Sequence, residues 1–138
     1  MSASDHRAII MRYAEEVFNK GDLGAVETYI DAGYLRHDPG LPFTVQGPEG
    51  IKQMVAAYRA AFPDIHLEPV SVVADGGTVA AHWSVTGTHQ GDLMGIPPTG
   101  KAIQIPAIEI FAFAGDKIVE QWVVVDNTAM MQQLGVGG

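Results

Sequence analysis

The first part of the chain has the hydrophobic periodicity of an amphipathic helix. Apolar residues recur at helical spacing over residues 9–18, with Ser4 or Asp5 placed to cap the helix and Gly21 placed to end it. Asp22 is in turn positioned to cap a short second helix that ends near residue 30.

A third helix is expected after a short extended segment. Residues 34–37 read as a brief strand, which ends at an Asp-Pro-Gly turn over 38–40. Pro48 suits the first position of the helix that follows, and that helix carries an apolar stripe until Pro63 interrupts it.

After Pro63 the hydrophobic period changes from helical to the alternation of β-strands. Strands are expected over residues 65–74, 79–86, 102–113 and 117–126, separated by Gly-containing turns. A closing helix over 128–134 ends at Gly135. Helices followed by an antiparallel meander indicate the α+β class, with a curved antiparallel sheet packed against N-terminal helices.

Composition narrows the class of protein. A chain of 138 residues fits one domain, residues 1–138, that needs no disulfide or metal to fold. The lack of cysteine excludes thiolate chemistry and fits a reducing compartment, so we expect a cytoplasmic protein. The net charge of −8 argues against nucleic acid as a partner, and no apolar run is long enough for a membrane span or a signal peptide.

Four stretches together resemble the SnoaL-like polyketide cyclase family, within the nuclear transport factor 2-like (ketosteroid isomerase-like) fold. They are Tyr-Leu-Arg-His at 34–37, Tyr-Arg-Ala-Ala-Phe-Pro-Asp at 58–64, the Gly-Thr-His…Ile-Pro-Pro-Thr-Gly segment at 87–100, and 117–126 leading to 132–135. The resemblance implies a cone with a mostly apolar internal pocket for a hydrophobic small molecule. It also implies that no cofactor is needed.

The resemblance also points to two positions for chemistry. Family cyclases close a ring by an intramolecular aldol step, with a carboxylic acid on the last strand and a polar partner, often histidine, on the strand before. Aligned on residues 117–120, the acid position falls at Val123 and the partner position at Glu109. Valine cannot transfer a proton, so Glu109 becomes the candidate base and Val123 a candidate pocket wall.

The direction of Glu109 depends on the turn at residues 114–116. A three-residue loop would place Glu109 opposite Gln121 and turn both toward the pocket, which is the register we favour. A two-residue loop would pair Glu109 with Trp122 and reverse the faces. The favoured register leaves Ile108, Ile110 and Trp122 on the convex side, which predicts a homodimer through that face.

Three other residues are candidates for catalysis, each with a structural alternative. Asp126 is a second carboxylate, or the N-cap of the closing helix. His89 either points to the pocket mouth or hydrogen-bonds within its own loop. His37 is either catalytic or holds the turn that follows it. By contrast, His6 and His66 are expected at the surface.

Aromatic residues are expected to line the pocket. We expect Trp83 and Phe111 from the strands to share one buried, cavity-lining face with Tyr58 and Phe62 from the third helix, and Gln121 to contribute a polar contact. No histidine and carboxylate pairs have metal-ligand spacing, so we expect no metal site.

The sequence therefore leaves three functions open. The leading hypothesis is cofactor-independent acid/base chemistry, of cyclase or isomerase type, on a hydrophobic carbonyl or polycyclic substrate. A non-catalytic binding protein for apolar small molecules is the alternative that Val123 favours. An epoxide hydrolase or dehydratase would need two pocket carboxylates, which only Glu109 and Asp126 would supply.

Overall fold

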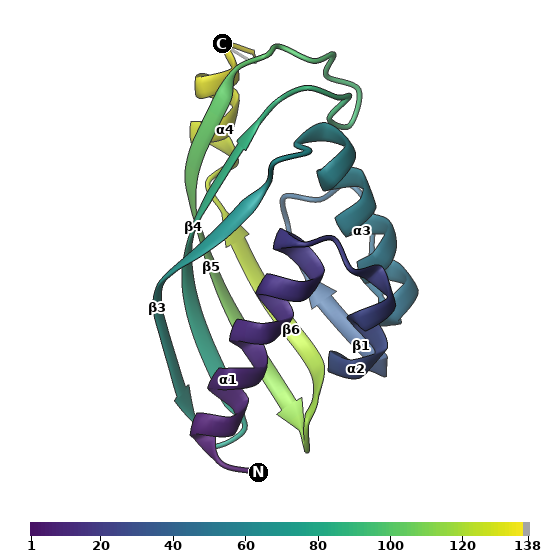
Figure 1. The fold of residues 1–138 in the computed structure, drawn as a ribbon, viewed down its shortest axis with the longest axis vertical. Helices are drawn as coiled ribbons and strands as arrows, with labels where there is room; N and C mark the ends of the chain where they lie inside the picture. Colours follow the sequence, from purple (N-terminus) through teal and green to yellow (C-terminus); the bar gives the residue numbers. More distant parts are fainter. Residues whose placement is uncertain (137–138) are drawn as a thin grey trace.

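The protein folds around one curved sheet with helices against its concave side (Figure 1). The computed structural model describes residues 1–136. Six strands have the spatial order β2-β1-β6-β5-β4-β3. Their bounds are β1 Ile30–His37, β2 Val45–Gln46, β3 His66–Asp75, β4 Thr78–Thr88, β5 Ala102–Ala114 and β6 Lys117–Val125.

The helices are α1 (Ala3–Tyr13), α2 (Val26–Tyr29), α3 (Gly47–Ala61) and α4 (Asn127–Leu134). Figure 1 shows α1 and α3 on one side of the sheet and α4 at the end where β6 leads out. The predicted α+β class with a curved sheet is confirmed. One strand pair differs from the prediction, because β1 runs parallel to β6. Within residues 1–136, no helix has the length and apolar character needed to cross a membrane.

The first helix begins earlier than predicted. Ser2 is its N-cap, and a reciprocal capping box joins Ser2 to Asp5. The predicted caps Ser4 and Asp5 are therefore inside the helix, with Asp5 at its third position. The helix continues as a π-helical segment, Ala14–Asn19, and the chain turns at Gly21, whose φ is +71°.

The β5–β6 hairpin has neither of the two expected registers. Its turn is short, since Ala114 pairs with Lys117, but the pairing shifts between Ala112 and Phe113. Phe113 lies opposite Ile118 and Ala112 opposite Glu120, so Val119 is an extra residue in β6.

Because of this extra residue, the side chains of β6 beyond Val119 face the same sides of the sheet as the favoured register predicts, although the turn is short. Glu109 lies opposite Val123, and Gln121 lies opposite Phe111. The predicted pairing of Glu109 with Gln121 is therefore wrong, whereas its predicted inward direction is confirmed, because Glu109 is only 7% exposed. The side chains that were expected on the convex face are indeed exposed there: Ile108, Ile110 and Trp122.

The concave face of the sheet forms the core together with the helices. Trp83 and Phe111 are each 1% exposed, and Phe62 at the end of α3 is buried to the same extent. The prediction that these aromatic side chains share one buried face is confirmed. Tyr58 is half-buried against the same cluster.

His6 connects α1 to the turns of two hairpins. Its Nδ1 lies 3.2 Å from the Gly76 carbonyl oxygen and its Nε2 lies 2.8 Å from the Gly115 carbonyl oxygen. The ring also stacks on Phe113 at 4.2 Å between centroids. The expectation of a surface histidine is wrong, because these contacts come from turns remote in sequence.

We expect His6→Ala to lower the free energy of unfolding by about 1–3 kcal/mol, since the buried ring is lost together with its contacts to the two turn carbonyl groups and its stacking on Phe113. Urea denaturation followed by circular dichroism measures this change. His66→Ala is the matched control, because the His66 side chain is exposed and hydrogen-bonds to the exposed Glu68 side chain two residues away. Equal losses in the two variants would contradict the connecting role of His6.

Candidate functional site

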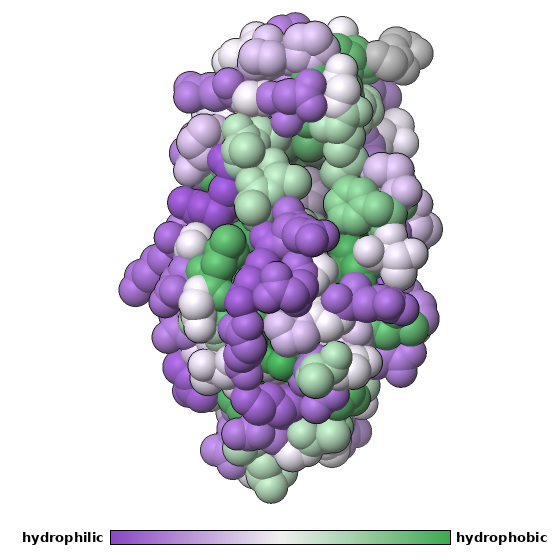
Figure 2. Space-filling model, turned by 90° about the vertical axis from the view of Figure 1, so that its right-hand side faces the viewer, coloured by the Kyte–Doolittle hydropathy of each residue, from purple (hydrophilic) through white to green (hydrophobic). Residues whose placement is uncertain are grey.

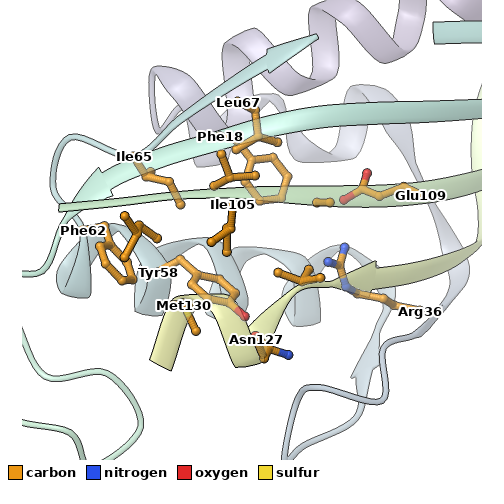
Figure 3. A pocket seen from close by; sticks show the side chains of 14 residues that line it. Phe18, Arg36, Tyr58, Phe62, Ile65, Leu67, Ile105, Glu109, Asn127 and Met130 are labelled. Atoms are coloured by element: carbon orange, nitrogen blue, oxygen red, sulfur yellow. The ribbon is translucent and has the colours of Figure 1, made fainter. Parts of the chain in front are cut away.

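A cavity lies between the concave face of the sheet, α3 and α4. The empty space within it, open mouth included, is about 580 Å³, of which about 60 Å³ is open to the centre of a water-sized sphere. Figure 3 shows an apolar end, where Phe62 and Ile65 lie, and an opposite end with Arg36 and Glu109. The polar lining residues are Arg36, Tyr58, Glu109 and Asn127.

Glu109 is the carboxylate of this cavity. It shares the inward face of the sheet with its cross-strand partners Ala81 on β4 and Val123 on β6, and the Trp83 indole Nε1 donates to its Oε2 at 3.3 Å. Burial raises the pKa of Glu109, while the positive charge of Arg36 and the Trp83 hydrogen bond act in the opposite direction. A carboxyl group with a raised pKa at the end of an apolar cavity is suited to exchanging protons with a bound molecule.

Arg36 and Asp38 form a buried ion pair beside Glu109. Arg36 Nε donates to Asp38 Oδ2 at 3.1 Å, and the two side chains are 5% and 7% exposed. Sequence reasoning missed both residues because it treated 34–37 only as a short strand. The available signal was parity, since Tyr34 and Arg36 share one face of β1 and that face is buried.

Two buried polar side chains outside the cavity lining, Tyr34 and Gln121, also act on Glu109. The Tyr34 hydroxyl donates to Gln121 Oε1 at 2.6 Å, and Gln121 is 1% exposed. The Gln121 side chain is in turn one of the groups that lower the pKa of Glu109 by hydrogen bonding. Gln121 therefore favours the ionised carboxylate and does not line the cavity itself.

The predicted substrate-binding residues divide into two groups. Tyr58 and Phe62 line the cavity, and burial raises the pKa of the Tyr58 hydroxyl to about 12. Trp83, Phe111 and Val123 are buried but are not among the lining residues, so the expectation that they line the cavity is not met. They shape the wall indirectly, and Trp83 does so through its hydrogen bond to Glu109.

His89 is fully buried and does not line the cavity. Its Nδ1 accepts a hydrogen bond from the Thr99 backbone N–H at 3.2 Å, and its backbone pairs with Lys101 and Gly100. The same loop approaches α3 closely at Gly91, where a Cβ atom would lie 2.0 Å from the Ala60 carbonyl oxygen. The structure thus places His89 within the fold of its own loop.

His37 points away from the cavity. Because Arg36 faces inward on β1, the next side chain faces outward, and His37 is 41% exposed. Its Nε2 lies 2.7 Å from Glu120 Oε2, and its ring stacks on Trp122. His37 is therefore on the convex side of the sheet.

Asp126 is the N-cap of α4, where its Oδ1 accepts from the Ala129 N–H at 2.9 Å. It is not among the residues that line the cavity, but its neighbour Asn127 is. Asn127 was missed because its place depends on a distant residue. A Cβ atom at residue 40 would lie 2.2 Å from Asn127 Nδ2, so a side chain there would displace the amide from its present place.

The capping role of Asp126 is testable apart from catalysis. We expect Asp126→Ala to lower the free energy of unfolding by about 1 kcal/mol, because one helix N–H loses its acceptor, whereas Asp126→Asn keeps most of that stability. Thermal denaturation of both variants measures the difference. Equal destabilisation by the two substitutions would contradict the assignment as a cap.

Metal-binding groups are not assembled in the part of the chain that the structure describes. Across residues 1–136, no three histidine or carboxylate side chains lie close enough together to hold an ion. The concentration of charge at the cavity is instead the Arg36, Asp38 and Glu109 group.

The curved sheet, the enclosed helices and the acid-bearing cavity define a nuclear transport factor 2-like cone protein. The chain belongs to the SnoaL-like polyketide cyclase family, whose model matches residues 8–134. It is 29% identical over 132 residues to the aklanonic acid methyl ester cyclase of Streptomyces sp. strain C5, covering 91% of this chain and 80% of the relative. It is 30% identical over 124 residues to the nogalonic acid methyl ester cyclase of Streptomyces nogalater, covering 86% and 89%.

Solved structures agree with this assignment. A crystal structure from Acidithiobacillus ferrooxidans superposes with a TM-score of 0.86 at 34% identity over 98% of both chains. A SnoaL-like polyketide cyclase from Agrobacterium tumefaciens superposes with a TM-score of 0.78 at 26% identity, over 98% of this chain and all of the other.

Proposed function

We propose that this protein is a cofactor-independent enzyme that performs acid/base chemistry of the cyclase type on a hydrophobic carbonyl compound. The observation that carries the proposal is Glu109, a buried carboxylate at the polar end of an apolar cavity. Relatives of this chain are named as cyclases of aklanonic acid methyl ester and of nogalonic acid methyl ester, and a methyl ester of a hydrophobic carbonyl compound is the substrate class we propose.

Glu109 is placed to replace the family acid from the neighbouring strand. The resemblance assigns the acid to position 123, and residue 123 here is the direct cross-strand partner of Glu109. Side chains in such a pair have Cβ atoms about 5 Å apart. A glutamate, one methylene longer than aspartate, therefore reaches the space in front of Val123.

The proposed reaction begins when ionised Glu109 removes a proton from a carbon next to a carbonyl group. The resulting enolate carbon attacks a second carbonyl carbon of the same molecule and closes a ring. Glu109 then returns the proton to the new alkoxide oxygen. The apolar end of the cavity, with Phe62 and Ile65, holds the hydrocarbon body and excludes water from the reacting atoms.

We expect Glu109→Gln to lower turnover of such an ester roughly 10²-fold or more, because the proton carrier is lost. Conversion followed by chromatography, with aklanonic acid methyl ester and nogalonic acid methyl ester as trial substrates, measures the loss. Asp126→Asn is the control, since Asp126 lies outside the cavity lining. Full activity in Glu109→Gln would refute the proposed role.

The same substitution should change the pH dependence of stability. The pKa of Glu109 is raised in the folded protein, so the folded state holds the proton more tightly than the unfolded state. The free energy of unfolding therefore falls as pH rises from the ordinary glutamate range through the raised pKa. Comparing urea denaturation at several pH values, we expect this fall to be smaller in Glu109→Gln than in the wild type.

A non-catalytic binding protein is the second candidate, favoured by Val123 at the family's acid position. Such a protein would bind apolar ligands equally well with Glu109 or glutamine, and would convert none of them. An epoxide hydrolase or dehydratase is less well supported, because Asp126 caps α4 and so leaves Glu109 without a second carboxylate among the cavity-lining residues.

We further propose that two copies associate through the convex face of the sheet. Ile110 and Trp122 are cross-strand partners, as are Ile108 and Val124, and all four are between 41% and 65% exposed. The side shown in Figure 2 is mixed, with hydrophilic groups over its middle and lower part and apolar areas among them, the larger ones in the upper half. An apolar patch on adjacent strands fits association with an identical patch about a two-fold axis.

Sedimentation velocity at micromolar concentration is expected to show a dimer, and Ile110→Lys is expected to shift it to monomer. Gln53→Lys, which adds the same charge on the exposed side of α3, should remain dimeric. A monomeric wild type would contradict the proposed association. The cytoplasmic location stays a prediction from the cysteine-free sequence.

A further inference from the structure

Arg36 has donor capacity that its known partners do not use. Its Nε is bonded to Asp38, while its Nη1 is buried and has no hydrogen-bond partner among residues 1–136. A guanidinium carries five N–H donors, and a buried donor without an acceptor is unfavourable. Arg36 also lines the cavity, so a bound molecule can supply the missing acceptor.

Figure 3 places the Arg36 guanidinium and the Glu109 carboxylate at the same end of the cavity. Together with Asp38, ionised Glu109 gives this group one excess negative charge. Once Glu109 has taken a proton from a substrate, Arg36 and Asp38 balance each other and the negative charge lies on the substrate. The arrangement therefore disfavours a permanent anion and favours an anion that forms in place.

We propose that Arg36 forms an oxyanion-binding subsite, in which its Nη1–H donates to the enolate oxygen of a β-dicarbonyl group. This inference rests on the proposed function and specifies the substrate class. The C–H bond between the two carbonyls breaks, its proton goes to Glu109, and its electron pair moves onto the carbonyl oxygen that faces Arg36. No oxidant, reductant or further reactant is needed.

The charges also set a specificity. A substrate with a free carboxylate near the reacting carbon would meet the two carboxylates Asp38 and Glu109 with only Arg36 to offset them. A neutral ester or ketone avoids that repulsion and becomes charged only after proton transfer. The subsite thus selects neutral β-keto esters and β-diketones over β-keto acids.

The probe for this subsite is 4-nitrophenolate, a flat anion whose colour distinguishes it from the neutral phenol. Binding is measured by absorbance titration and needs no turnover. Glu109→Gln resembles the protein after proton transfer, so it should bind 4-nitrophenolate roughly tenfold or more tightly than the wild type does. Arg36→Met and Asp38→Asn are then added together to Glu109→Gln, which removes the ion pair without leaving a single buried charge. This variant should lose the tighter binding of 4-nitrophenolate.

Two controls separate the subsite from general damage. Nitrobenzene, an uncharged analogue of similar shape, should bind all variants equally if the cavity is intact. Arg7→Met in the Glu109→Gln background removes an exposed arginine that contacts the Val72 carbonyl outside the cavity. This variant should bind 4-nitrophenolate as tightly as Glu109→Gln alone. If the variant lacking the ion pair does not fold, Arg36→Lys in the Glu109→Gln background replaces it. We then expect weaker binding of 4-nitrophenolate and unchanged binding of nitrobenzene.

The subsite is overturned if Glu109→Gln does not bind 4-nitrophenolate, or binds it equally with and without the Arg36–Asp38 pair. This outcome is distinct from failure of the proposed function. Loss of turnover in Glu109→Gln without an effect of Arg36 on the probe rejects the subsite alone. Full turnover in Glu109→Gln with the expected probe result rejects the catalytic role of Glu109 and retains the anion site.

Discussion

The register of the β5–β6 hairpin is the constraint on which the candidate site depends. Side chains alternate between faces along a strand, so one extra residue reverses every side chain beyond it. The extra residue at Val119 compensates for the short turn, so that Gln121 and Val123 on β6 face inward together with Glu109 on β5. The same register leaves Ile110 and Trp122 on the convex face. The inward side chains of β6 beside Glu109 and the outward Trp122 of the proposed dimer surface are thus two results of one pairing.

Placing a carboxylate in the core requires compensation, and the fold supplies it from several elements. Trp83 on β4 donates to Glu109, and the Arg36–Asp38 pair lies beside it from β1 and the following turn. A buried ion pair is weak evidence for stability, because desolvation offsets much of the attraction. Arg36 with an unused donor at a cavity is more readily understood as a binding group.

The most recognisable family segment, residues 87–100, has a structural explanation in this protein. His89 accepts a backbone hydrogen bond inside its loop, and Gly91 allows that loop to contact the end of α3. Such residues identify the family because they build the cone. They say little about the reaction, which the residues facing the cavity decide. This explains how Val123 can stand at the acid position in a chain whose fold is otherwise typical.

Local patterns in the sequence were enough for the helices, the four long strands, the α+β class and the inward direction of Trp83, because periodicity reflects which face of an element is buried. The capping role of Asp126 was one of two readings that the sequence allowed, since a cap involves neighbouring residues. His6, Arg36 and Asn127 were different. Each acquires its role from partners remote in the chain: the turns at Gly76 and Gly115, the carboxylate of Glu109, and the space left by Gly40. No local pattern encodes such contacts, since they exist only once the sheet has curved around the helices.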